Sequence, residues 1–155
     1  GLVADYVQGF GAKVIGYDPA AEQRSDITYM NLDDVLAQAD IISLHIPYNE
    51  DNHHLINTEK LGKMKKGAIL INTARGGIID EDALYEALQT GTIGGAALDV
   101  FEEEPYKGTL AKLDNVILTA HAGSYAREAR AEQETESVRN LIKGLNIETE
   151  DRHYG

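Results

Sequence analysis

Cysteine is absent from this sequence of 155 residues, and its absence excludes several kinds of site. Without cysteine there is no disulfide framework, no thiolate metal site and no cysteine nucleophile. Long apolar runs are missing as well, since none approaches the roughly twenty residues that span a bilayer, and no signal-peptide pattern opens the chain. We therefore expect a cytoplasmic protein that makes no use of a membrane.

Positive charge is scarce: 14 Lys and Arg face 26 Asp and Glu, for a formal net charge of −12. Nucleic acids and anionic membranes would repel such a chain, so we expect neither as a partner. The hydrophobic share of 43% and the charged share of 26% are ordinary for a folded globular protein. The length allows one domain with a buried core.

Short apolar runs alternate with segments of helical spacing. Strands are predicted at residues 13–17, 41–46, 68–72, 94–98 and 116–119, and helices at 2–10, 32–39, 58–64, 80–90 and about 124–145. Residues 20–30 show no period and are interpreted as a loop, and Asn31, Thr58 and Asp80 are the expected helix caps. This alternation predicts a parallel sheet with right-handed crossovers, hence a doubly wound α/β fold of the Rossmann type.

Three of the predicted strands run into a residue with useful chemistry. Arg75 follows the predicted strand at residues 68–72, Asp99 follows the one at 94–98, and His121 follows the one at 116–119. Open α/β sheets bind ligands outside the carboxyl ends of their parallel strands. We therefore expect these three side chains to gather along one edge of the sheet.

Arg75 carries a planar fork of donors that holds a carboxylate through two parallel hydrogen bonds. A surface salt bridge is the plainer interpretation of a single arginine. Gly76 and Gly77 favour a ligand site, because glycine lets the backbone approach a ligand closely.

His121 has the intrinsic pKa of a general acid or base, although a structural role is the common one for a single histidine. A neighbouring carboxylate would stabilise its protonated form and orient the ring. Glu104 is a candidate for that carboxylate, and Glu102 and Glu103 are rivals for the same role. A fully solvated acidic loop is the remaining alternative.

Asp18 ends the strand at residues 13–17, where a nucleotide-binding unit places a carboxylate that accepts hydrogen bonds from the adenosine ribose. Such a carboxylate would repel the 2′-phosphate of NADP, so NAD is the expected cofactor. The alternative is a turn cap before Pro19. The fingerprint Gly-x-Gly-x-x-Gly is not present in the sequence.

The sequence predicts no metal site. His53 and His54 are adjacent and would point different ways in an extended segment, and the acidic run at residues 102–104 lacks the alternating spacing of a calcium loop. His45 ends a strand, where contact with a ligand competes with a packing or capping role.

Taken together, several motifs resemble the D-isomer-specific 2-hydroxyacid dehydrogenases, a family that includes D-lactate and D-3-phosphoglycerate dehydrogenases. The resemblance extends over residues 1–145. It rests on VIGYDP at residues 14–19, SLHIP at 43–47, INTARGG at 71–77, ALDVF at 97–101 with Glu104-Pro105, and HAGS at 121–124.

The resemblance implies hydride transfer between NAD(H) and a small 2-oxo or 2-hydroxy acid. It implies that Arg75 binds the carboxylate and carbonyl of the substrate, that His121 protonates the carbonyl oxygen and that Glu104 pairs with His121. It also implies a homodimer, and it places a further set of residues at the cofactor: Asp18, Pro19, His45, Pro47, Thr73, Ala74, Asp99 and Gly123.

Two departures from the family qualify this expectation. The first strand with its glycine fingerprint is missing, and so is most of the separate substrate domain. We therefore expect residues 1–145 to form an NAD-binding domain truncated at its N-terminus, with residues 146–155 as a tail toward the missing domain. The missing strand should leave a gap within the sheet, and the isolated chain should have little dehydrogenase activity.

Two other functions fit parts of the pattern. An NAD-sensing protein that resembles the transcriptional corepressors related to this family would keep the same three catalytic residues. A formate dehydrogenase of the same fold is disfavoured, because that enzyme has glutamine where Glu104 stands.

Overall fold

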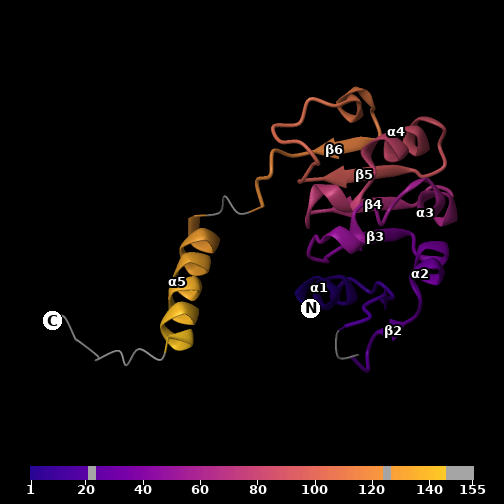
Figure 1. Cartoon of the computed structure of the whole chain (residues 1–155). Helices are drawn as coiled ribbons and strands as arrows, with labels where there is room; N and C mark the ends of the chain where they lie inside the picture. Colours follow the sequence, from indigo (N-terminus) through magenta and orange to yellow (C-terminus); the bar gives the residue numbers. More distant parts are fainter. Residues whose placement is uncertain (21–23, 124–126, 146–155) are drawn as a thin grey trace. The chain divides into compact units, whose positions relative to one another are not determined.

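A computed structural model describes residues 1–20, 24–123 and 127–145 of the chain (Figure 1). Contacts within the chain divide it into two compact units, Gly1–Ala120 and His121–Gly155. The first unit contains all the described strands. The second contains one described helix.

The first unit is built on a four-stranded parallel sheet with the order β3-β4-β5-β6. Its strands are β3 (Ile41–Leu44), β4 (Ile69–Asn72), β5 (Gly95–Leu98) and β6 (Val116–Leu118). Leu44, Asn72, Leu98 and Leu118 lie level with one another across the sheet. The predicted parallel arrangement is confirmed, and the residues that follow these strands start from a common edge.

Two further strands, β1 (Ile15–Gly16) and β2 (Thr28–Tyr29), pair in parallel as a separate sheet. Among the described residues no strand hydrogen-bonds the two sheets together, which agrees with the expected gap. The prediction of a loop throughout residues 20–30 was wrong, because it missed β2. Two residues are too few to show alternation, and pairing with β1 supplies the order.

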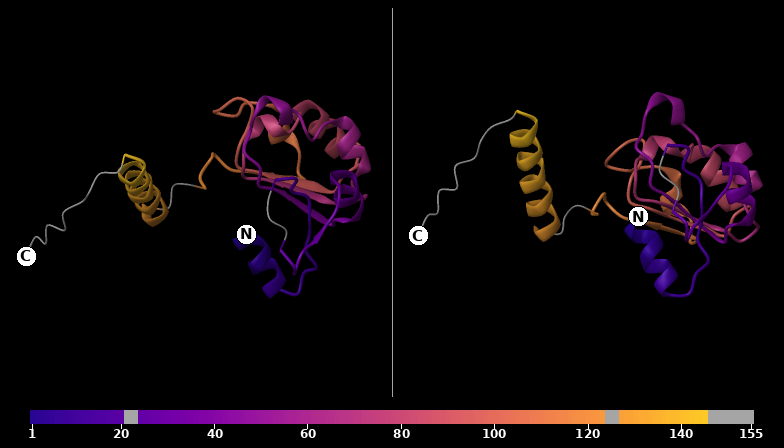
Figure 2. Two further views of the ribbon diagram at one scale, coloured as in Figure 1. Left: turned by 60° about the horizontal axis from the view of Figure 1, so that its bottom comes forward. Right: turned by 90° about the horizontal axis from the view of Figure 1, so that it is seen from below.

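Helices cover both faces of the fold. Figure 2 shows α2 (Leu32–Gln38), α3 (Thr58–Lys63) and α4 (Glu81–Gln89) on one face, with α1 (Leu2–Gly9) on the opposite side. Short 3-10 helices occupy Glu50–Asn52 (η1), Gly76–Ile78 (η2) and Thr109–Lys112 (η3). This is the doubly wound arrangement that the alternating pattern predicted.

Side-chain caps fix where the main helices begin. Asn31 accepts a hydrogen bond from the Asp34 amide, and Asp80 accepts one from the Ala83 amide, so both predicted caps are confirmed. The prediction that Thr58 caps α3 was wrong by one residue. Asn57 has the extended backbone of a cap and accepts from the amide of Lys60, which leaves Thr58 inside the helix.

The core lies between the four-stranded sheet and helices α2–α4. Alternate strand residues point into it, and Leu70 is fully buried. On the opposite sheet face the side chains of Ile41, Ile69 and Ile117 are 59%, 40% and 69% exposed. The core is completed from the helices and loops by Leu36, Ile56, Leu61, Ile78, Leu84, Leu88 and Leu110.

The described helix of the second unit is α5 (Arg127–Gly144). Its predicted start near Ser124 and the predicted tail at 146–155 lie outside the described residues. Val138 and Leu141, which supplied its apolar spacing, are exposed. Within the described part of the chain, no helix is both long and apolar enough to cross a membrane.

Candidate functional site

A hollow of about 570 Å³ opens where β3 and β4 end. Its walls come from the segments that follow the two strands, and it includes five of the predicted site residues: His45, Pro47, Thr73, Ala74 and Arg75. Ile46 and Tyr48 complete the lining. Because β3 and β4 are parallel neighbours with level ends, residues almost thirty positions apart in the chain meet here.

The turn that presents Arg75 is shaped by Asn72, which belongs to the INTARGG motif but had no predicted role of its own. Asn72 is 1% exposed. Its Oδ1 accepts from the Ala74 amide at 3.0 Å, and its Nδ2 donates to the Arg75 carbonyl at 2.9 Å. Asn72 satisfies both halves of its amide inside the turn and so fixes the backbone from which the arginine projects. An amide at a position where the strand pattern calls for an apolar side chain was the available signal.

Arg75 lies between two hollows. Its side chain is exposed, and its Nη1 donates to the Ala74 carbonyl at 2.6 Å. A second hollow of about 350 Å³ begins on its other side. That hollow is lined by Tyr48, His53, Arg75, Gly76, Gly77, Phe101 and Glu102.

The glycines after Arg75 allow a close approach between two loops. A Cβ on Gly76 would lie 1.9 Å from the carbonyl carbon and oxygen of Phe101, and one on Gly77 would lie 2.8 Å from the ring of Tyr48. The expected close approach at Gly76 is therefore present, but its partner is not a ligand. It is the loop of residues 101–104, here called the acidic loop. Glycine at residue 76 brings the Arg75 turn directly against the loop that carries Glu104.

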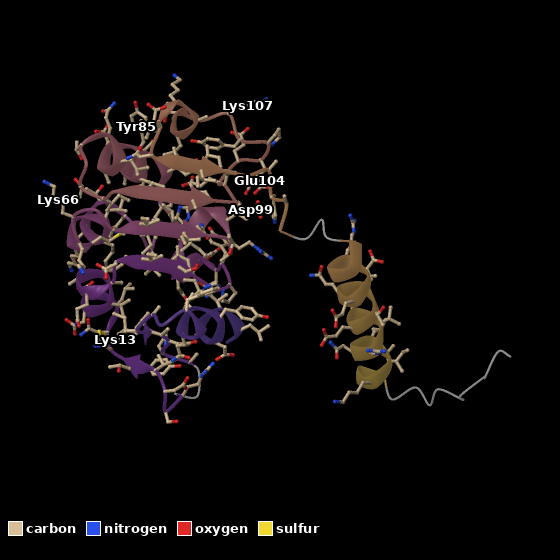
Figure 3. All side chains as sticks on the ribbon, turned by 180° about the vertical axis from the view of Figure 1, so that it is seen from behind. Lys13, Lys66, Tyr85, Asp99, Glu104 and Lys107 are labelled. Carbon is tan, nitrogen blue, oxygen red and sulfur yellow. The ribbon has the colours of Figure 1, made fainter. Side chains whose placement is uncertain are left out.

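Asp99 and Glu104 lie at the carboxyl edge of the four-stranded sheet, as Figure 3 shows, with Lys66 at the opposite edge. Asp99 is 8% exposed, and its Oδ1 accepts from the Thr119 hydroxyl at 2.5 Å. The Glu104 carboxylate accepts from the amide of Phe101 at 3.2 Å. The edge thus brings Arg75, Asp99 and Glu104 onto one side of the first unit.

Glu102, the alternative to Glu104 as the carboxylate beside His121, contacts other residues. Its Oε1 lies 2.7 Å from Nε2 of His54, and its amide donates to Glu81 at 2.8 Å. Burial raises the pKa of Glu81, and the hydrogen bond from Glu102 partly offsets that effect. The side chains of residues 102 and 104 therefore serve different contacts.

His121 and Gly123 follow β6 and are exposed. His121 has a positive φ of 53°. Both residues belong to the second unit, so the pairing of His121 with Glu104 stays a prediction.

Asp18 and Pro19 follow β1 and are exposed. One carboxylate oxygen of Asp18 accepts from the Ala20 amide at 3.0 Å, as the turn-cap alternative requires. A role of Asp18 at the adenosine ribose stays a prediction.

The expectation that His53 and His54 point different ways was wrong. Their rings stack with centroids 3.8 Å apart, because His54 has a positive φ of 50° and the segment is not extended there. His45 is exposed and its Nε2 lies 2.9 Å from the Ser43 hydroxyl. No cluster of three or more metal-ligating side chains occurs among the described residues.

Comparison with known proteins connects this arrangement to a family. Residues 1–123 match the description "D-isomer specific 2-hydroxyacid dehydrogenase, NAD binding domain". The chain is 44% identical to a hydroxypyruvate reductase of Thermotoga maritima over 150 residues, covering 94% of this chain and 49% of that protein. It is 42% identical to a glyoxylate reductase of Korarchaeum cryptofilum, covering 90% of this chain and 44% of that protein.

Solved structures give the same result. A D-lactate dehydrogenase with NAD+ from Lactobacillus jensenii is similar with a TM-score of 0.84 at 34% identity, covering 96% of this chain and 50% of that one. An acyclic imino acid reductase in complex with NADPH and D-Arg is similar with a TM-score of 0.85 at 37% identity, covering 93% of this chain and 47% of that one. The chain spans about half the length of the curated relatives named above.

Proposed function

The chain belongs to the D-isomer-specific 2-hydroxyacid dehydrogenase family and matches its NAD-binding domain. We propose that it forms the nucleotide-binding half of an NAD-dependent oxidoreductase. The proposed enzyme interconverts D-2-hydroxy acids and 2-oxo acids. The observation that carries the proposal is the hollow at the ends of β3 and β4, with Arg75 in its wall and Asp99 and Glu104 on the same sheet edge.

The position of the hollow supports its assignment as the nicotinamide site. It lies at the carboxyl edge of a parallel sheet, where open α/β folds bind nucleotides, and Pro47, Thr73 and Ala74 line it beside His45. When bound, NAD(H) supplies the hydride that is exchanged with the substrate carbon. Asp18, after β1, is the proposed acceptor for the adenosine ribose, and its charge favours NAD over NADP. Gly123 completes the proposed cofactor contacts.

Arg75 is the proposed anchor for the acid. Arg75 lines both hollows. Asn72 fixes the turn that carries it by donating a hydrogen bond to the Arg75 carbonyl. The guanidinium fork is the proposed holder of the substrate carboxylate, through two parallel hydrogen bonds. His121 would then give a proton to the carbonyl oxygen, Glu104 would stabilise the imidazolium, and Asp99 would lie near the nicotinamide.

The proposal includes a location and an assembly. We propose that the protein acts in the cytoplasm, where its cofactor and the small acids are available, and that it forms a homodimer. Exposed apolar side chains support an assembly through the nucleotide domain: Tyr6 in α1 and Phe10 at its C-terminal end are 65% and 91% exposed.

A hybrid enzyme tests the proposal. The chain would replace the matching half of the Thermotoga maritima hydroxypyruvate reductase, and NADH oxidation would be followed with glyoxylate or hydroxypyruvate. We expect activity from the hybrid and little from the chain alone, because the chain spans only about half the length of these relatives and closure over the substrate completes such sites. A hybrid that binds NADH but transfers no hydride would contradict the dehydrogenase and favour the NAD-sensing alternative.

Arg75→Lys in the hybrid tests the anchor. Lysine keeps the charge but loses the two parallel bonds, so kcat/KM should fall roughly ten- to hundredfold. Lys66→Ala is the control, because it removes an exposed cation at the opposite edge of the sheet. Equal kcat/KM values for the Arg75→Lys and Lys66→Ala hybrids would refute the role of Arg75.

A further inference from the structure

His54 contacts both the turn that follows Arg75 and the acidic loop. Its side chain reaches Glu102, with Nε2 2.7 Å from the carboxylate, across 48 positions of sequence. Its Nδ1 lies 3.9 Å from the carboxylate of Asp80, the residue that caps α4. One imidazole is therefore set between the start of a helix and the acidic loop.

The backbone of the same residue supports the Arg75 turn. The His54 amide donates to the Gly77 carbonyl at 2.9 Å, and the Ile56 amide donates to the Ile78 carbonyl at 3.0 Å. The Asp80 amide donates to the Ile56 carbonyl at 3.0 Å. The segment around His54 thus runs beside the turn and ties down the residues that directly follow Arg75.

The acidic loop is tied at two more points. The Glu102 amide donates to Glu81 at 2.8 Å, and the next residue back, Phe101, donates its amide to Glu104. Gly76 packs against the backbone of Phe101 and Glu102. A displacement of Glu102 would therefore be transmitted both to the Arg75 turn and to Glu104.

The conformation of His54 is itself unusual. Its φ of 50° lies in the left-handed region, which a residue with a β-carbon rarely adopts and which persists where surrounding contacts determine it. The ring of His53 stacks on it at 3.8 Å and holds it from the other side.

We propose that His54 is a positioning residue, which joins the Arg75 turn to the Glu104 loop through its backbone bond to Gly77 and its side-chain pair with Glu102. The proposal rests on the proposed function, because it assigns His54 the task of fixing Arg75 relative to Glu104. His54 itself is not proposed to touch substrate or cofactor.

Amide hydrogen exchange of the chain, followed by NMR, tests the connection without cofactor or substrate. The His54–Glu102 pair has side chains 33% and 37% exposed, so its loss should alter global stability little. In His54→Ala the amides of Phe101 and Glu102 should exchange roughly tenfold faster or more, while core amides keep their rates. His54→Gln retains a donor toward Glu102 and should restore most of the protection.

Lys65→Ala is the matched control, because Lys65 pairs with Asp40 between two loops at the other edge of the sheet. It should leave exchange at Phe101 and Glu102 unchanged. The proposal is overturned if His54→Ala does not accelerate exchange at these two amides, or if it accelerates exchange equally at core amides such as that of Leu84.

The hybrid enzyme tests the consequence for catalysis. A displacement of Arg75 against Glu104 by about 1 Å should lower kcat/KM roughly ten- to hundredfold in His54→Ala, with recovery in His54→Gln. Unchanged kcat/KM in His54→Ala refutes the positioning role. Failure of the unmodified hybrid to oxidise NADH refutes the proposed function instead, and the exchange result on the chain distinguishes the two.

Discussion

Replacing Gly76 with alanine should separate the two loops of the proposed site. The added Cβ would lie 1.9 Å from the carbonyl carbon and oxygen of Phe101 and 2.5 Å from the amide nitrogen of Glu102. Ordinary contact begins at 3.4 Å, so the backbones must move apart by about 1.5 Å. Because the obstacle is backbone, no change of side-chain rotamer relieves it.

The magnitude follows from the cost of overpacking that forces backbone shifts, which is about 1–3 kcal/mol. For a chain of this length we expect the midpoint of thermal unfolding to fall by about 2–12 °C. The assay is unfolding by heat and by urea, with ellipticity as the signal. In the hybrid enzyme the same shift should lower kcat/KM by about a hundredfold.

Gly62→Ala is the control for this substitution. A Cβ there meets nothing within 4 Å, and Gly62 lies inside α3, where alanine should stabilise the helix by roughly 0.5–1 kcal/mol. Opposite effects of the two glycine substitutions are therefore expected. An unfolding midpoint of Gly76→Ala equal to that of the unmodified chain would refute the close contact between the two loops.

Three further predictions concern Asp26, Asp80 and His121. The hydrogen bond from Arg24 lowers the pKa of Asp26 from 3.8 to about 2. The stabilisation of the fold by this pair is therefore present above pH ~4 and is lost as the pH falls toward 2. The free energy of unfolding of Asp26→Asn in urea should vary less with pH in that window, and a pH dependence identical to that of the unmodified chain would contradict the pair. Asp80→Ala removes the cap on the Ala83 amide and should cost about 1 kcal/mol in urea unfolding, whereas Asp80→Asn should keep most of it; equal losses would count against capping. His121→Ala in the hybrid should lower kcat roughly 10²- to 10⁴-fold with NADH affinity unchanged, and an unchanged kcat at every pH would exclude the catalytic role.

The sequence predicted the edge of the sheet because its signals are local. An apolar run that ends on Asn72 and leads to Arg75 is readable over a few residues, and parallel pairing then brings Asp99 to the same edge. β2 was missed because its two residues carry no pattern and are ordered by pairing with β1. The cap at Asn57 was misplaced because adjacent asparagine and threonine both suit that role, and only the backbone distinguishes them.

The contacts of His54 and of Asn72 could not be predicted from the sequence. His54 and Glu102 are 48 positions apart, and their meeting depends on a left-handed backbone at His54 and on the absence of a side chain at Gly76. Neither condition leaves a periodic signal. The role of Asn72 also depends on burial, which alternation alone does not give for a polar residue.

The fate of a labelled hydride tests the proposed transfer between NADH and a 2-oxo acid directly. NADH that carries deuterium at the transferred position of its nicotinamide C4 would be supplied to the hybrid enzyme with hydroxypyruvate, and the glycerate product examined by NMR and chiral chromatography. We expect D-glycerate with deuterium at C2. Bound NADH with no labelled product, or a product of the L configuration, would contradict the proposed transfer.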